Sequence, residues 1–173
     1  MPIYMDRHDI PKDITAEHVA LMHQEDLKVQ HLYGCKGMTY WCDEDKRMAF
    51  CLIEAPNKKA IQEMHNHAHG EFPHSIIEVN EKIVTSFLGR IEDPKSDGNS
   101  ELNIINDPAF RVIMVLETSN YLNRLEANQF SIFTQKFHNS VSKTLKHFNG
   151  RIVKKDNNSY LVSFTSVTDA VLC

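Results

Sequence analysis

Histidine is concentrated in the first half of this 173-residue chain, in a pattern that suits metal binding. Eight of the ten histidines precede residue 75, and the segment EMHNHAHGEFPH, residues 63–74, holds four of them. Neutral imidazoles suit borderline ions such as Ni²⁺, Zn²⁺, Cu²⁺ and Co²⁺, whereas Mg²⁺ and Ca²⁺ prefer oxygen ligands. This concentration predicts transition-metal chemistry in the N-terminal half.

The spacing within this segment separates its histidines. His65 and His69 are four residues apart on a predicted helix, so their side chains lie on one flank and can bind the same ion, whereas His67 faces the other flank. Asn66 stands where an HExxH zinc protease has its general base, so the pair does not predict a protease. A pair of helical ligands needs further ligands from other elements.

His8 and His23 are the predicted partners of this pair. His8 lies near the end of an alternating strand, PIYMDRHDI, and His23 lies on the inward stripe of a helix predicted over residues 13–34. The first strand and the second helix run the same way in the predicted topology, which brings His8 to the edge that holds the pair. We therefore predict a metal site whose ligands are His8, His23, His65 and His69, to which Asp6 or Asp26 could add an oxygen.

The predicted elements follow the order βαββαβ over about the first 80 residues. After the first strand and helix, GMTYWC and RMAFCLIEA form a hairpin around the polar turn DEDK. The second helix, NKKAIQEMHNHAHG, ends at Gly70 and is followed by the strand SIIEV. This order predicts an α+β domain of the ferredoxin-like type, with two helices on one face of an antiparallel sheet.

A connector and a second domain are predicted after residue 80. The segment EDPKSDGNSE, residues 92–101, is rich in residues that break regular structure. From residue 110 the strand FRVIMVLET, a long helical segment and a hairpin follow. The predicted domains are residues 1–80 and 110–173, joined by a connector over residues 81–109.

Composition and charge exclude several classes of function. A net charge of -4 supplies no broad cationic surface, so no nucleic-acid partner is expected. No apolar run reaches the ~18 residues of a membrane span and no targeting segment precedes the first strand, so we expect a cytoplasmic protein without a membrane partner. The four cysteines lack CxxC spacing and are predicted to be reduced structural thiols.

The segments MPIYMDRHDI, CLIEAP, MHNHAHG and SIIEV resemble the small nickel-binding, ferredoxin-like family known as DUF4242 or SCO4226-like. The resemblance covers roughly residues 1 to 80. It implies a homodimer that binds nickel through histidines, and it ranks nickel above zinc, copper and cobalt as the cofactor. Copper would also bind such a site, because stability constants generally rise from nickel to copper.

Residues 110–173 resemble the opening of a class III adenylate/guanylate cyclase domain. In that family two acidic residues orient two metal ions on a nucleoside triphosphate. Glu117 stands at the first of these positions, but Asn158 occupies the second, with Asp156 two residues away. The later segments of the family are absent, so the resemblance implies a partial cyclase-like α/β domain without cyclase activity, in which Glu117 is the candidate cofactor-binding residue.

We predict a metal-binding protein, sensory or buffering, that takes nickel, and leave open whether it is also an enzyme. One alternative is a small metal-dependent or acid/base enzyme that uses His8, His23, Asp26 and Tyr40. The other is a regulatory module that binds a nucleotide through Glu117.

Overall fold

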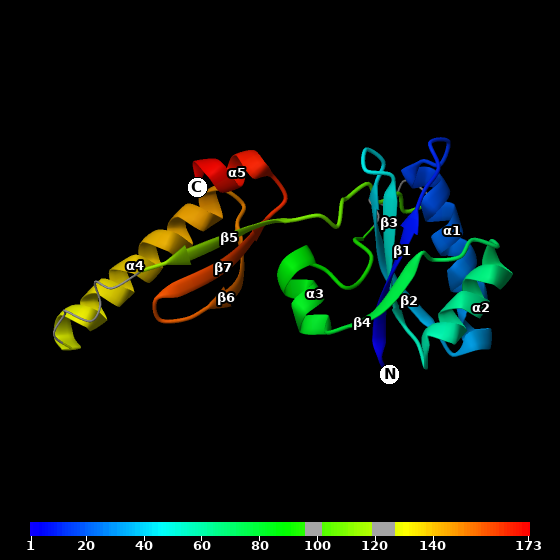
Figure 1. Ribbon diagram of the computed structural model, residues 1–173, viewed down its shortest axis with the longest axis horizontal. Coiled ribbons are helices and arrows are strands. Elements are labelled where there is room, and N and C mark those ends of the chain that lie inside the picture. The colour runs from blue at the N-terminus through cyan, green and yellow to red at the C-terminus, as the bar shows by residue number, and fades with distance from the viewer. Residues whose placement is uncertain (96–101, 119–126) are drawn as a thin grey trace. The chain divides into compact units, whose positions relative to one another are not determined.

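The computed structural model describes residues 1–95, 102–118 and 127–173, with only the backbone of residues 127–131 (Figure 1). The protein is mixed α/β, and its sheets are antiparallel. It forms two compact units: unit 1 comprises residues 1–85 and 90–109, and unit 2 comprises residues 86–89 and 110–173. None of the helices in the described residues has the length and apolar character of a membrane span.

Unit 1 follows the predicted βαββαβ order through residue 79. Its four-stranded sheet has the order β2-β3-β1-β4, so β1 lies between β3 and β4. The elements are β1 (Ile3–Asp9), α1 (Ala16–Val29), the short 3-10 helix η1 (Gln30–Tyr33), β2 (Lys36–Asp43), β3 (Met48–Glu54), α2 (Lys58–Ala68), β4 (Ser75–Val79) and the first part of α3 (Glu81–Leu88).

The two helices α1 and α2 lie next to each other on one face of this sheet (Figure 1). Alternate residues of each strand face them, and the core between the layers includes Tyr4, Tyr40 and Ile53. The Asn57 side chain caps the N-terminus of α2 by accepting a hydrogen bond from the Ala60 amide at 3.0 Å.

The C-terminus of α2 fixes the position of its histidines. The amides of His69 and Gly70 both donate to the carbonyl of His65 at 3.0 Å. Gly70 has a φ of 79°, the left-handed conformation that commonly ends a helix and that suits glycine. The end predicted for this helix is therefore confirmed, and His65 lies in its last turn.

Residues 90–95 and 102–109 pack within unit 1, on the side of β2. The Tyr40 hydroxyl donates to the carbonyl of Asn103 at 2.9 Å and accepts from the amide of Ile105 at 2.8 Å. The guanidinium of Arg90 lies 4.4 Å from the centre of the Trp41 ring. The predicted connector thus includes residues that belong to a core, and the division at residues 80 and 110 stays a prediction; residues 96–101 lie outside the described part.

Unit 2 has a three-stranded antiparallel sheet of order β5-β7-β6. Its core joins Leu145 of the long helix to Tyr160, Val162 and Phe164 of β7. The predicted hairpin corresponds to β6 and β7, while residues 120–126 of the predicted helix lie outside the described residues. The elements are β5 (Val112–Glu117), α4 (Ala127–His147), β6 (Arg151–Lys155), β7 (Ser159–Phe164) and α5 (Val167–Leu172).

Candidate metal centre

His65 is buried between two carboxylates that come from different elements. Its Nε2 lies 2.8 Å from Oδ2 of Asp6 on β1, and its Nδ1 lies 2.9 Å from Oδ1 of Asp26 on α1. Burial opposes a charge on the ring, but the hydrogen bonds to Asp26 and Asp6 outweigh it and raise the pKa of His65 to about 10. The metal-free ring therefore carries a positive charge between the two carboxylates.

The carboxylates have lowered pKa values for the same reason. Burial alone would raise the pKa of Asp6, but hydrogen bonds with His65 and His8 hold it well below its ordinary value. The pKa of Asp26 is also lowered, since His65 and His69 outweigh its burial. Both carboxylates are thus anionic and buried against imidazoles.

His69 and His8 complete the cluster from opposite sides. His69 Nε2 lies 3.4 Å from Asp26 Oδ1 and 3.2 Å from His65 Nδ1, one helical turn away. His8 Nε2 lies 3.5 Å from Asp6 Oδ1, and its ring meets the edge of the His65 ring at 5.2 Å between centres. The structure therefore brings together His8, His65 and His69, three of the four predicted ligands.

His23 lies on the same cavity but makes a different contact. Its Nε2 is 3.2 Å from Oδ2 of Asp93, and its ring centre is 5.0 Å from that of Tyr40. Asp93 lies in the segment that the sequence predicted as a connector. The role of His23 as a ligand stays a prediction.

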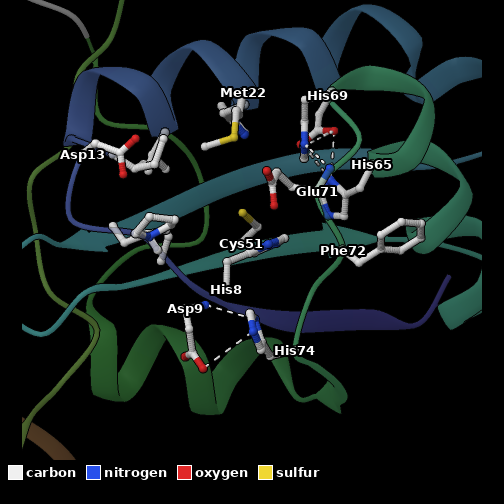
Figure 2. A pocket seen from close by; sticks show the side chains of 17 residues that line it. His8, Asp9, Asp13, Met22, Cys51, His65, His69, Glu71, Phe72 and His74 are labelled. Atoms are coloured by element: carbon white, nitrogen blue, oxygen red, sulfur yellow. Dashed lines mark hydrogen bonds and ion pairs between the residues drawn. The ribbon is translucent and has the colours of Figure 1, made fainter.

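A cavity of about 230 Å³ opens beside this cluster (Figure 2). His8, His65, His69 and Cys51 line it, as labelled in Figure 2. The apolar part of its wall comes from α1 and the segment before it, with Ile10, Ile14, Val19 and Met22. Its exposed rim comes from the segment after α2, with Glu71, Phe72 and His74.

Two groups of three ligand atoms lie close enough to share an ion. One comprises Asp6, His8 and Cys51, and the other comprises Asp26, His65 and His69, with the atoms of each group within 4.8 Å of one another. Imidazole nitrogen, carboxylate oxygen and thiol sulfur together suit nickel, zinc, copper or cobalt better than magnesium or calcium. The donor chemistry therefore fits a transition-metal ion.

Cys51 is the member of these groups that the sequence did not single out. It was predicted as a structural thiol, and burial together with the nearby Asp6 and Asp26 raises the pKa of this thiol well above its ordinary value. The one sequence feature that could have indicated Cys51 was its position on a predicted strand, because successive side chains of a strand point to opposite faces of the sheet. His67 faces away from the cluster, as predicted, and its Nδ1 lies 3.0 Å from the Tyr33 hydroxyl.

Glu117 is the last residue of β5 and is exposed. The carbonyl of Asn158, opposite the end of this strand, accepts from the amide of Thr118 at 2.9 Å, and Asp156 pairs with Lys154 at 3.1 Å. Among the residues that the structure describes, the groups able to share an ion do not include Glu117. Its role in holding a metal or nucleotide stays a prediction.

The fold and this cluster define an α/β protein with a buried histidine and carboxylate centre. Residues 4–79 match the model of a family described as "Nickel responsive protein SCO4226-like". A solved structure, SCO4226 from Streptomyces coelicolor A3(2), is 31% identical over 44% of this chain and 94% of that chain, with a TM-score of 0.42. By this identity and coverage, the chain belongs to the SCO4226-like family through its N-terminal segment.

A second solved structure is only distantly similar to this chain. A bacterial light-regulated adenylyl cyclase is similar over 99% of this chain and 64% of that chain, at 11% identity and a TM-score of 0.32. A similarity this low carries no argument about unit 2. No curated protein matches the chain.

Proposed function

We propose that unit 1 is a ferredoxin-like metal-binding domain that holds a transition-metal ion, nickel first, in the cavity beside His65. The observation that carries this proposal is the cluster of three imidazoles and two carboxylates beside that cavity, which come from β1, α1 and the C-terminal end of α2. His8, Asp26, His65 and His69 line the cavity, and Asp6 lies behind them in contact with His65. The description of the family as nickel responsive supports nickel over zinc, copper and cobalt. The protein would act in sensing or buffering of the ion.

The charge of the site favours a cation at this position. Asp6 and Asp26 are almost fully buried, and isolated buried carboxylates cost free energy unless a positive charge lies between them. The protonated His65 ring supplies this charge in the metal-free protein. A divalent ion held by imidazoles and carboxylates would supply it when the ring has lost a proton, so metal and proton compete for the same place.

The ligands come from elements that are already packed. The pairing of β1 with β3 and β4 positions Asp6 and His8. His65 lies in the last turn of α2, and His69 is the C-cap residue of this helix. His23 lines the same cavity and is proposed as a further ligand, which would have to exchange Asp93 for the ion. A preformed ligand set costs little ordering entropy on binding.

Metal titration tests the proposal. Untagged protein is loaded with nickel, zinc or copper and dialysed, and its bound metal is measured by elemental analysis. The double substitution His65→Ala and His69→Ala is expected to remove binding. A matched control, His31→Ala with His147→Ala, removes two exposed histidines from outside the cavity and should leave binding unchanged. Undiminished binding in the first variant would refute the site.

We also propose that the protein is a cytoplasmic homodimer and that unit 2 is a cyclase-like domain without cyclase activity. The last point rests on Asn158, an amide at a position where that family has a metal-binding carboxylate. Light scattering measures the mass in solution, and a monomer would contradict the dimer. Cyclic nucleotide formation from ATP or GTP with manganese would contradict the inactivity of unit 2.

A further inference from the structure

Cys51 lies in the wall of the cavity, next to the imidazole and carboxylate cluster (Figure 2). We propose that its sulfur is a ligand of the ion bound there, so that the site combines nitrogen, oxygen and sulfur donors. This inference rests on the proposed function. It adds a residue that neither the histidine pattern nor the family resemblance indicated.

The register of the sheet directs Cys51 at the cluster. On β3 it lies opposite Asp6 of β1, and its backbone amide donates to Asp6 Oδ1 at 3.1 Å. Side chains two residues apart on a strand share a face, so Cys51 faces the helices together with Ala49 and Ile53. The thiol and the carboxylate are therefore held next to each other by backbone pairing.

The distances suit a shared ion. The ligand atoms of Cys51, His8 and Asp6 all lie within 4.8 Å of one another. Two ligands that each lie about 2.0–2.3 Å from one ion are separated by at most about 4.6 Å. Three ligands of one ion lie closer together than this limit, so the side chains would have to draw the three atoms together around the ion.

The other cysteines of unit 1 lack this placement. Cys35 donates to the carbonyl of Tyr33 at 3.7 Å, and Cys42 is fully buried on β2. Neither belongs to the cavity lining or to the ligand groups found among the described residues. Cys42 is therefore a matched control for Cys51, since both are buried thiols that face the core of unit 1.

Sulfur coordination has a chemical consequence. Binding breaks the S–H bond of Cys51 and forms a sulfur–metal bond, and the proton leaves to solvent; no oxidation state changes. A thiolate is a soft ligand, so it favours nickel, copper and zinc over magnesium and manganese. Cys51 would thus determine which ions the site accepts.

Optical titration of the full-length protein tests the proposal. Nickel or cobalt is added to the reduced protein without oxygen, and the near-ultraviolet spectrum is followed for a sulfur-to-metal charge-transfer band. The wild type and Cys42→Ser are expected to show the band, and Cys51→Ser to lose it. Loss of a group that only hydrogen-bonds to a metal ligand weakens metal binding by roughly tenfold or more. Loss of Cys51 as a direct ligand should therefore weaken nickel binding by at least roughly tenfold.

A second measurement needs only the wild-type protein, in case Cys51→Ser does not fold. Alkylation of each cysteine is mapped by mass spectrometry with and without nickel, and Cys51 should be protected more strongly than Cys35 or Cys42. If nickel binds but neither the band nor the selective protection is seen, the assignment of Cys51 is overturned and the histidine site stands. If none of nickel, cobalt, zinc and copper binds, the proposed function fails and this inference fails with it.

Discussion

Substitution of His65 by alanine is the most informative perturbation of unit 1. It removes two short hydrogen bonds, of 2.8 Å to Asp6 and 2.9 Å to Asp26, and leaves both carboxylates in place. A hydrogen bond to a charged group contributes about 1.5–3 kcal/mol, and removal of one partner of a buried ion pair costs about 3–5 kcal/mol. We therefore expect His65→Ala to lower the free energy of unfolding by about 3–5 kcal/mol without added metal.

This loss is large compared with the stability of the unit. Typical domains have a free energy of unfolding of about 5–15 kcal/mol, so the variant would lose a large part of this free energy. It would therefore unfold at a clearly lower urea concentration. Asp6 keeps the amide of Cys51 and Asp26 keeps His69 as partners. These remaining contacts are the reason to expect a folded variant.

Urea denaturation followed by tryptophan fluorescence measures the effect on unit 1 alone. Trp41 is the single tryptophan of the chain and is fully buried on β2. Nickel at about 100 times its dissociation constant should add about 2.7 kcal/mol to the wild type. It should add nothing to His65→Ala, and a chelator should reverse the gain in the wild type.

The exposed His31 provides the control. Its substitution by alanine should change the unfolding free energy by less than about 0.5 kcal/mol and should leave the gain from nickel intact. A loss of less than about 1 kcal/mol in His65→Ala would refute the reasoning, because the carboxylates would then not need the imidazole.

Three further substitutions test individual contacts. Asn57→Ala removes the cap of α2 and should lower the free energy of unfolding, measured by Trp41 fluorescence, by about 1 kcal/mol, with Asn57→Ser close to wild type. An unchanged unfolding curve would show that the Asn57 side chain does not stabilise the helix. Tyr40→Phe removes the hydroxyl that binds two backbone groups, so it should lower the free energy of unfolding by about 1–3 kcal/mol and speed amide hydrogen exchange at Ile105. Unchanged exchange at Ile105 would contradict this hydrogen bond. Gly150→Ala would place a Cβ 2.8–2.9 Å from core side chains of unit 2. We expect it to lower the free energy of unfolding of unit 2, measured by circular dichroism, by about 1–3 kcal/mol and to leave the Trp41 unfolding curve unchanged. An unaltered circular dichroism transition would show that the core side chains move aside without cost.

The elements of unit 1 were predictable because each has a local signal. The end of α2 follows from Gly70, and the β2–β3 hairpin follows from two β-favouring runs around a polar turn. The packing of residues 90–95 and 102–109 had no such signal. The hydroxyl of Tyr40 binds the backbone 63 and 65 residues further along, and only tertiary structure reveals this contact.

In the candidate site, too, some features follow from local sequence patterns and others depend on tertiary structure. The helical spacing of His65 and His69 predicted their shared flank, and the topology predicted the approach of His8. The place of His65 between Asp6 and Asp26 depends on how α1 and α2 pack on the sheet, which no local pattern reports. His23 was predicted as an inward ligand, but its observed partner, Asp93, lies in a segment that the sequence predicted as a connector.

The pairing of β1 with β3 ties metal binding to the folding of unit 1. Alternation along β1 places Asp6 and His8 on one face, and the antiparallel register sets Cys51 opposite Asp6. A slip by one residue would turn these side chains to the opposite face of the sheet, away from α2 and its histidines. The ligand set therefore exists only in the native register. An ion that binds this set stabilises unit 1, and any substitution that weakens the β1–β3 pairing should lower the apparent metal affinity in proportion to the folded fraction.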